Sequence, residues 1–406
     1  MIQFPQTPQY LQGLSLIDQL NQQGFQAYLV GGCVRDLLLR KEVSDYDICS
    51  SALPEDVQRI FPKTVDTGSQ WGTITVVTDH DSYEITTFRK ESTYTDGRHP
   101  DAIDFHGSLE SDLERRDFTI NAMAYHRKTG LIDPYGGEVD LSMGILRAVG
   151  NPYLRFAEDY LRILRGLRFS ATLNLKLEEE TGEALLVNSH GLIDITRERV
   201  TNEIKKLVMG QYVENIADYY PVLEEGVFFG IDCLWEAEEE GQLRDKWKEI
   251  SQAPPLLSLR LALFLSLFAP DSRFLKLSKQ ESQEVDFLCE MPCIPWEGEK
   301  FFLDTIQKEG KERTKLLLFY QKHQFPYHRG EIEALEATLM EKDCTSLGDL
   351  AINGTDLLQR GVQGEMIGKL LAIALKMVLA EEVNNEKEAL LALIFGERQE
   401  QGELDL

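Results

Sequence analysis

Hydrophobic and polar positions follow one rhythm in the first part of the chain and another beyond about residue 150. Short runs such as "QAYLVGG" (26–32), "SDYDICS" (44–50) and "SYEITTFR" (82–89) have the alternation or β-rich composition of strands. Between the first two, "CVRDLLLRK" (33–41) has helical spacing. We therefore predict a small domain of mixed strands and helices over residues 1–150.

Two further segments complete this first domain. "GTITVVT" (72–78) and the run that begins at Ser82 are predicted to form a hairpin. "DLERRDFTINAMAYH" (112–126) is predicted to be helical, with a turn at "LIDPYGG" after it.

Strand patterns fade after residue 151, and helical periodicity with Gly, Pro and Asn punctuation replaces them. The predicted helices include the segments 151–173, 178–189 and 195–210, and "QAPP" (252–255) is a predicted linker between later helices. The fold class expected from this pattern is α+β, an α/β domain followed by a long all-helical part.

The apolar runs are too short for a membrane span. "LRLALFLSLFAP" (259–270) falls well below the roughly 20 apolar residues that a bilayer requires, so it is predicted to be a buried helix. The first residues lack the basic-then-apolar layout of a signal peptide. We expect no membrane association and a cytoplasmic location.

Cysteine usage does not indicate a zinc site or a disulfide framework. Only two of the six cysteines are close in sequence, and no second Cys or His pair accompanies them. They are Cys33, Cys49, Cys233, Cys289, Cys293 and Cys344. We expect reduced and mostly buried thiols.

The net charge of −26 argues against binding nucleic acid through bulk electrostatics. The charge is uneven: residues 1–170 have 17 basic and 24 acidic side chains, and residues 171–406 have 25 and 44. An RNA partner would therefore have to meet local basic patches.

Two carboxylates form the first candidate site. Asp45 and Asp47 are two residues apart, so on a strand both side chains would project from one face. Paired carboxylates repel each other unless a cation lies between them, and hard oxygen ligands suit Mg²⁺ completed by phosphate oxygens. A polar, solvent-facing strand is the alternative interpretation.

A glycine turn strengthens the first interpretation. Gly31 and Gly32 lie between a predicted strand and a predicted helix, where the backbone can approach an anion closely. Arg35, one turn into that helix, could donate a forked pair of hydrogen bonds to the same anion. Glu84 is a possible third carboxylate if its strand lies beside that of Asp47; a surface carboxylate is equally compatible with the sequence.

Three arginines recur every third residue in "EDYLRILRGLRF" (158–169), which is predicted to be helical. Asp159 and Arg162 would be neighbours on one face, and they would present an acceptor beside a donor. Cytosine and adenine offer the complementary donor and acceptor, whereas guanine and uracil offer the reverse order. Arg165 and Arg168 could continue this stripe toward phosphate or base. The alternative is a ladder of ion pairs within the helix, beginning with Glu158 and Arg162.

Taken in order, five motifs closely resemble the class II CCA-adding enzymes, bacterial tRNA nucleotidyltransferases that share their catalytic module with poly(A) polymerases. The motifs are "YLVGGCVRDLLL", "SDYDI", "LERRDFTINAMAY", "EDYLRILRGLRFSA" and "ITRERVTNEIKKL". A further segment at 351–391 resembles the C-terminal part of the Gram-positive type.

The resemblance implies an architecture and roles. It implies a catalytic nucleotidyltransferase head at 1–150, a base-recognising neck at 151–210, a body at 211–295 and a tRNA-binding tail at 296–406. Within the tail, the basic cluster at 308–330 is a candidate tRNA contact.

The resemblance also implies residue roles. The metal carboxylates would be Asp45 and Asp47, and the other implied residues form the ATP and CTP site. These are Gly32, Arg35, Arg116, Asp159, Arg162, Arg165 and Arg168.

The expected activity is addition of C, C and A to the 3′ end of tRNA from CTP and ATP, with Mg²⁺ as cofactor; a homodimer is a family-level expectation. In the family that the chain resembles, CC-adding enzymes have a shortened form of the loop that helps to switch the site from CTP to ATP. The resemblance therefore implies that the full-length polar loop at 87–107 favours C and A addition, or A addition alone, over CC addition. Poly(A) polymerases of this type usually have a basic C-terminal extension, so the acidic end "GERQEQGELDL" argues against that activity. A non-catalytic RNA-binding or nucleotide-binding protein on the same scaffold is a further alternative.

Overall fold

The computed structural model describes residue 4 and residues 6–79, 81–91, 103–105, 107–230, 240–268 and 272–396. Most of the predicted loop at 87–107 and nearly all of the acidic end at 396–406 lie outside the described residues. The chain divides into two compact units. One comprises Met1–Ala253 and Phe274–Lys276, and the other Pro254–Arg273 and Leu277–Leu406. The first border falls within the predicted linker; the limits of head, neck, body and tail stay a prediction.

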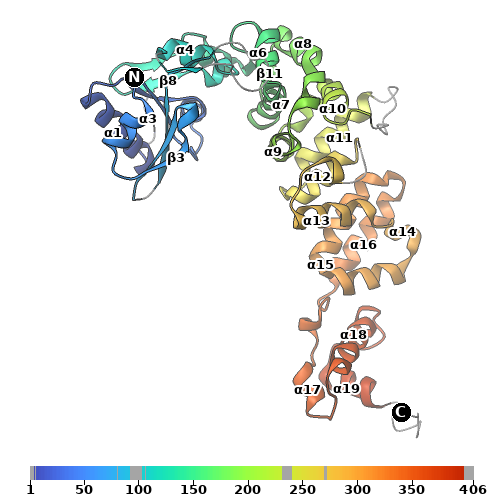
Figure 1. Cartoon of the computed structure of the whole chain (residues 1–406). Coiled ribbons are helices and arrows are strands. Elements are labelled where there is room, and N and C mark those ends of the chain that lie inside the picture. The colour runs from blue at the N-terminus through green and yellow to red at the C-terminus, as the bar shows by residue number, and fades with distance from the viewer. Residues whose placement is uncertain are drawn as a thin grey trace. The chain divides into compact units, whose positions relative to one another are not determined.

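A seven-stranded sheet organises the start of the first unit (Figure 1). In spatial order its strands are β3 Thr64–Gly68, β4 Thr73–Val77, β5 Ser82–Thr87, β2 Asp47–Ser50, β1 Ala27–Val30, β8 Ala124–His126 and β9 Gly130–Ile132. β2 and β5 run parallel, and the other neighbours are antiparallel. Two-stranded pairs join β6 Lys90–Glu91 to β7 Ile103–Asp104, and β10 Ile145–Leu146 to β11 Lys176–Leu177.

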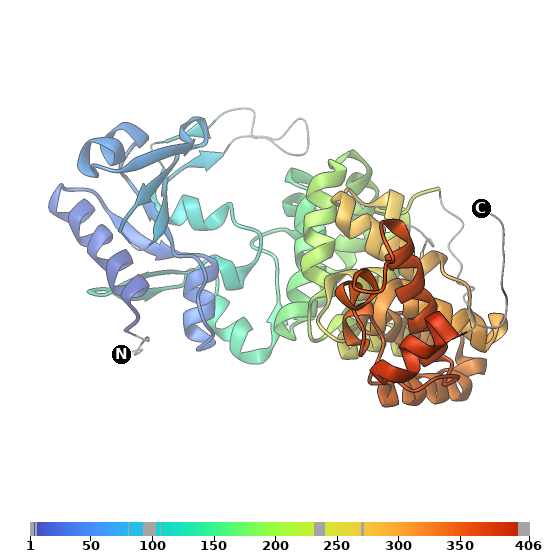
Figure 2. The same ribbon diagram turned by 90° about the horizontal axis from the view of Figure 1, so that it is seen from below.

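Helices cover both faces of this sheet, and the alternation along its strands assigns each side chain to a face. In β5, Tyr83 and Ile85 are buried in the core that includes α1 and α3, whereas Glu84 points to the other side and is exposed. The helix α1, dark blue in Figure 1 and Figure 2, lies along the sheet on that first face. The second face packs against α4 through Leu109 and Leu113.

Helices account for most of the remaining elements. In the first unit they are α1 Pro8–Gln22, α2 Gly32–Leu38, α3 Pro54–Ile60, α4 Leu109–Glu114, α5 Gly137–Met143, α6 Pro152–Glu158, α7 Leu161–Leu173, α8 Glu179–Asn188, α9 Arg197–Val208, α10 Tyr220–Gly226 and α11 Glu240–Gln252. In the second unit they are α12 Leu257–Leu265, α13 Lys279–Glu290, α14 Ile294–Glu297, α15 Glu299–Gln324, α16 Arg329–Glu341, α17 Gly354–Leu358, α18 Glu365–Leu379 and α19 Lys387–Gly396.

The predicted α+β class is confirmed, with a sheet-containing start and a helical remainder. The apolar run at 259–270 overlaps α12, whose residues from Leu259 to Leu265 are all buried, as predicted. No described helix is long and apolar enough to cross a bilayer.

The helical prediction for 112–126 is wrong beyond its first residues. α4 ends at Glu114, a 3₁₀ turn follows at Thr119–Asn121, and Ala124–His126 forms β8 at the side of β1. Residues 117–124 are all buried, so their hydrophobicity has no period that distinguishes a helix from a strand.

Candidate functional site

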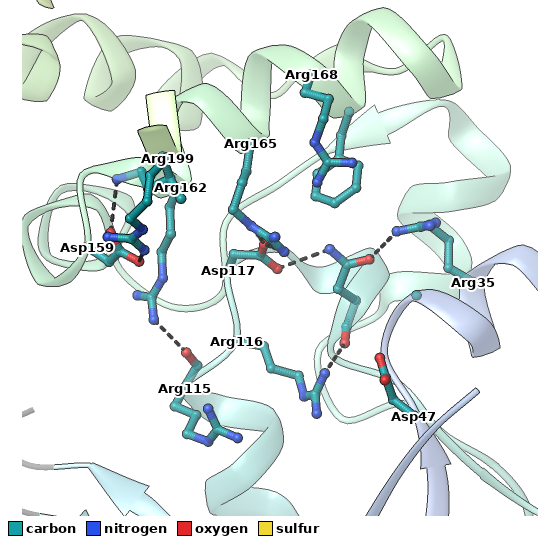
Figure 3. Close-up of a pocket in the computed structure, with 14 residues that line it drawn as sticks. Arg35, Asp47, Arg115, Arg116, Asp117, Asp159, Arg162, Arg165, Arg168 and Arg199 are labelled. Atoms are coloured by element: carbon teal, nitrogen blue, oxygen red, sulfur yellow. Dashed lines mark hydrogen bonds and ion pairs between the residues drawn. The ribbon is translucent and has the colours of Figure 1, made fainter. Parts of the chain in front are cut away.

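A cavity of about 470 Å³ in the first unit brings most of the candidate residues together. Its volume is in the range of small-molecule sites. It is lined by Gly32, Arg35, Asp47, Arg115, Arg116, Asp117, Asn121, Asp159, Leu161, Arg162, Arg165, Arg168, Phe169 and Arg199. In Figure 3, Arg162, Arg165 and Arg168 extend from one helix toward Arg116 and Asp47 on the opposite side.

The glycine turn lies at the edge of this cavity. Gly31 follows β1 with φ of +78°, a conformation that glycine adopts without strain. A Cβ atom at Gly31 would lie 2.7 Å from Nη1 of Arg116. Arg116 can therefore approach the turn only because residue 31 has no side chain. Arg35 is buried behind the turn, where Asp36 and Asn121 accept its hydrogen bonds at 2.9 and 2.6 Å.

The two candidate metal carboxylates lie at the start of β2. Asp47 is its first residue and is paired in register with Glu84 of β5, so the possible third carboxylate does lie beside it. The prediction that Asp45 belongs to the same strand is wrong. β1 ends at Val30, so it has no residue that could pair with Asp45, and Asp45 lies before the first residue of β2. Its side chain is exposed and accepts a hydrogen bond from the hydroxyl of Ser44. Asp45 and Glu84 are not among the cavity-lining residues.

The electrostatics of Asp47 suit a cation. Burial is the main cause that raises the pKa of Asp47 to about 6; the negative charges of Glu84 and Asp45 add to the rise, and Arg116 opposes it. A bound cation would remove this penalty. No three described His, Cys, Asp or Glu side chains form a closed metal site. The donors fit a hard ion held by two carboxylates and completed by phosphate and water oxygens.

The segment 158–169 is not one helix, so this prediction is also wrong in its first residues. α6 ends at Glu158, and Asp159 has an extended backbone with φ of −147° and ψ of 103°. One carboxylate oxygen of Asp159 accepts the N–H of Leu161 at 3.0 Å, which satisfies a free donor at the start of α7. The other oxygen accepts a bond from Arg199 at 3.1 Å.

Arg162 is held by acceptors on both sides of the cavity. Its guanidinium bonds Glu158 at 2.5 Å, as the ion-pair alternative predicted, although the pair now spans the break between α6 and α7. It also donates to the carbonyl oxygens of Arg155 and Arg115 at 2.9 and 3.0 Å. Asp159 and Arg162 both line the cavity, but they are not hydrogen-bonded to each other through their side chains in this structure.

The next two arginines of α7 pair with carboxylates from other elements. Arg165 makes a 2.5 Å ion pair with Asp117, and Arg168 makes one of 2.6 Å with Glu203 of α9. Burial raises the pKa of Asp117, but attraction to Arg165 and hydrogen bonds from Asn121 and Arg165 outweigh it, so the pKa lies below its ordinary value. The Arg168 guanidinium also stacks over Phe169, 4.0 Å from the ring centroid.

Six cavity residues were not singled out from the sequence: Arg115, Asp117, Asn121, Leu161, Phe169 and Arg199. All six lie inside motifs that were recognised, so the motifs located them without indicating what they contact. Asp112, fully buried in α4, holds Arg115 at 2.6 Å and Arg116 at 3.1 Å and thereby orients both toward the cavity.

Two donors in the cavity wall are buried without a hydrogen-bond partner among the described residues: Nε of Arg116 and Nη1 of Arg199. Orphaned donors of this kind are costly unless a ligand satisfies them. The wall as a whole has seven arginines and three aspartates, a local positive charge in a chain of net charge −26. A polyanion with acceptor groups fits this arrangement.

Comparison with known families supports the same interpretation. Residues 27–147 match the model of the poly A polymerase head domain, and residues 273–394 match that of tRNA nucleotidyltransferase domain 2.

Similarity to individual proteins extends over nearly the whole chain. A CCA-adding enzyme of a Geobacillus species is 36% identical over 389 residues, 93% of this chain and 95% of the relative. One from Enterococcus faecalis is 34% identical over 407 residues, with coverage of 96% and 97%. The Bacillus stearothermophilus CCA-adding enzyme, solved in complex with CTP, is 33% identical over 97% of this chain and 98% of its own, with a TM-score of 0.70.

Proposed function

Because the chain belongs to the family of CCA-adding enzymes and is a nucleotidyltransferase, we propose that this cavity is where it adds C, C and A to the 3′ end of tRNA. CTP and ATP are the substrates, no nucleic-acid template is used, and pyrophosphate leaves. The observation that supports this most is that one cavity is lined by Asp47 on one side and by Asp159 and Arg162 on the other. Phosphate chemistry and base choice can therefore take place in one site.

Enzymes of this family depend on divalent metal ions, and we propose Mg²⁺ held by Asp45 and Asp47. The ion would lower the pKa of the attacking tRNA 3′-hydroxyl and neutralise charge on the triphosphate. Burial raises the pKa of Asp47, and the bound cation would keep this carboxylate ionised. Glu84, its neighbour in register, would add negative charge to the same edge of the sheet.

Arginines of the head would hold the triphosphate. Arg116 has an unpaired Nε donor in the cavity wall and lies against Gly31, where a larger residue would displace it. Arg35 lies beside Gly32 at the start of α2. Both are fixed by buried polar partners, so the α-phosphate would be oriented for in-line attack without reorganisation of the site.

The incoming base would meet the neck side of the cavity. Asp159 supplies acceptors and Arg162 supplies donors, which complements the Watson–Crick edges of cytosine and adenine. Guanine and uracil would leave buried groups unpaired. Arg165 and Arg168 would line the pocket beside the base or the phosphates, and Arg199 would hold Asp159 in place.

An incorporation assay tests this function. Purified protein, Mg²⁺ and a tRNA that lacks its 3′ CCA are supplied with each labelled NTP alone and in pairs. We expect C and A incorporation that stops after three nucleotides. A addition only on tRNA ending in CC, CC addition alone, a long A tract, or no incorporation would each identify a different activity and contradict the proposal.

Three expectations about partners and location accompany this function. tRNA would be bound in part by the predicted tail, where the basic cluster at 308–330 is the candidate surface. A location in the cytoplasm fits such a substrate. The homodimer stays a prediction from family resemblance.

A further inference from the structure

Asn121 is a buried residue of the cavity wall to which the reaction described above gives no role. It ends the 3₁₀ turn Thr119–Asn121, between α4 and β8, and is 5% exposed. Its side chain lies between an arginine of the head and a carboxylate that faces α7. A buried amide in that position must satisfy a charged group on each side.

A continuous chain of hydrogen bonds runs through Asn121. Nη1 of Arg35 donates to Oδ1 of Asn121 at 2.6 Å, and Nδ2 of Asn121 donates to Oδ1 of Asp117 at 3.0 Å. Oδ2 of Asp117 accepts Nε and Nη2 of Arg165 at 2.7 and 2.5 Å. Figure 3 shows the dashed bonds that lead from Arg35 to Asp117. The chain joins α2 of the head to α7.

The two ends of the chain determine which side chain can stand in its middle. Arg35 can only donate, and an ionised Asp117 can only accept. The residue between them must therefore accept on one side and donate on the other, and an amide on a short stem does both. Ionised aspartate at 121 would lack the donor, and an apolar residue would leave buried charges on both sides without a partner.

The same contact fixes the orientation of the Arg35 guanidinium. Asp36 accepts from Nε and Nη2 at 2.9 Å each, and Asn121 accepts from Nη1. Since arginine has five N–H donors, one N–H remains on each terminal nitrogen. A phosphate group can accept two such bonds from one guanidinium.

We propose that Asn121 is a positioning residue for nucleotide binding: it locks Arg35 so that the two remaining N–H groups face the triphosphate. This rests on the proposed function, in which Arg35 contacts the phosphates. Because CTP and ATP share the triphosphate, Asn121 affects binding of both equally and does not affect base choice. It acts through Arg35 and touches no reacting atom.

A double-mutant cycle on the full-length protein tests this. KM and kcat are measured for CTP on tRNA lacking CCA, and for ATP on tRNA ending in CC. The variants are Asn121→Ala, Arg35→Ala and the double variant. Asn188→Ala is the matched control, since Asn188 is another buried asparagine of this unit, bonded to the carbonyl of Ala184 and outside the cavity. Asn121→Ser, whose hydroxyl is too short to bridge both partners, repeats the cycle if the alanine variant does not fold.

We expect Asn121→Ala to raise KM for CTP and ATP by the same factor, roughly tenfold, and Arg35→Ala to raise it somewhat more, as loss of a hydrogen bond to a charged group does. The double variant should match Arg35→Ala, with kcat nearly constant. Multiplicative effects, or a fall in kcat at constant KM, would overturn the positioning role. If Arg35→Ala leaves KM unchanged, both this role and the phosphate role of Arg35 fail. Failure of CCA addition itself would already be visible in the unsubstituted protein.

Discussion

The two sides of the cavity treat charge in opposite ways. At the start of β2, Asp47 has the like charges of Asp45 and Glu84 as neighbours, and its pKa rises to about 6, mainly through burial. Across the cavity, each arginine of α7 has a carboxylate partner: Glu158 for Arg162, and partners from distant elements for the next two arginines. The acidic edge therefore favours a bound cation, whereas the arginine wall formed by Arg162, Arg165 and Arg168 already has carboxylate partners.

Because of this difference, substitutions on one side of the cavity should affect mainly activity, and substitutions on the other side should also affect the stability of the fold. Removing a charge from the acidic edge relieves repulsion, so the fold should tolerate the change while the chemistry is lost. Removing a charge from the arginine wall leaves a partner buried without compensation, so the fold should weaken as well. Substitutions on each side of the cavity can test this contrast.

Asp47→Ala should abolish turnover while leaving the fold intact. If Asp47 holds the metal as proposed, its loss removes charge stabilisation of several kcal/mol, so we expect kcat to fall by roughly three orders of magnitude or more. The thermal midpoint without metal should stay the same or rise. Asp79→Ala is the control, because Asp79 is an exposed carboxylate paired with Lys63 at the surface. Substantial residual activity in Asp47→Ala would remove the basis of the metal assignment.

Asp117→Asn should destabilise the protein, in contrast to the substitution of Asp47. The substitution removes the charge that pairs with the partly buried guanidinium of Arg165. We expect the free energy of unfolding to fall by about 3 kcal/mol at pH 7, measured by chemical denaturation. The pKa of Asp117 is lowered in the folded state, so this stabilisation is present above the unfolded pKa of about 4 and is lost as pH falls below it.

The control for Asp117 is Asp218→Asn. Asp218 pairs with Arg244 at 2.7 Å, but both side chains are more than half exposed, so the change should matter little. If both substitutions lower the free energy of unfolding equally, the ion pair in the cavity wall stabilises the fold no more than a surface pair does.

Arg162→Ala should relax base choice more than it weakens triphosphate binding. We expect the preference for CTP and ATP over GTP and UTP to fall roughly tenfold to thirtyfold, the range of one lost directional contact to a base edge. Relative kcat/KM values for the four nucleotides measure it. Arg147→Ala is the control, since Arg147 pairs with Asp140 and Glu178 outside the cavity. A uniform loss for all four nucleotides would indicate that Arg162 does not read the base.

Local pattern located the strands that present the acidic edge, although β2 begins only at Asp47 and leaves Asp45 outside it. The strands at 26–32 and 82–89 were predicted from their composition and alternation, and the register that brings Glu84 beside Asp47 depends on a parallel pairing that the sequence could only suggest. The break at Asp159 was not predicted. Its neighbours have helical spacing, and only the carboxylate bonded to Leu161 and Arg199 shows why the chain opens there.

The carboxylate partners of the cavity arginines could not be predicted from local sequence patterns, because most of them are far away in the sequence. Arg165 and Asp117 are 48 residues apart, and Arg199 and Asp159 are 40 apart. Helical spacing predicts neighbours three or four residues away, and it did predict the bond between Glu158 and Arg162. Pairings between elements depend on how the elements of the first unit pack together, which no periodicity encodes.

A weaker effect is expected for metal binding in the absence of substrates. Mg²⁺ at ten times its Kd should stabilise the protein by about 1.4 kcal/mol at pH 7.5, seen as a rise in thermal midpoint, and by less at pH 5. Without metal, the raised pKa of Asp47 makes its ionised form costly above pH of about 6, and this cost is relieved as pH falls toward the unfolded pKa of about 4. Protons and Mg²⁺ therefore compete for the same carboxylate. Asp47→Asn should remove the Mg²⁺ effect at both pH values and should itself stabilise the metal-free protein most at pH 7.5; Asp79→Asn should do neither. If Mg²⁺ still raises the thermal midpoint of the Asp47→Asn variant, the cation binds elsewhere, and the acidic side of the cavity is then not a metal site.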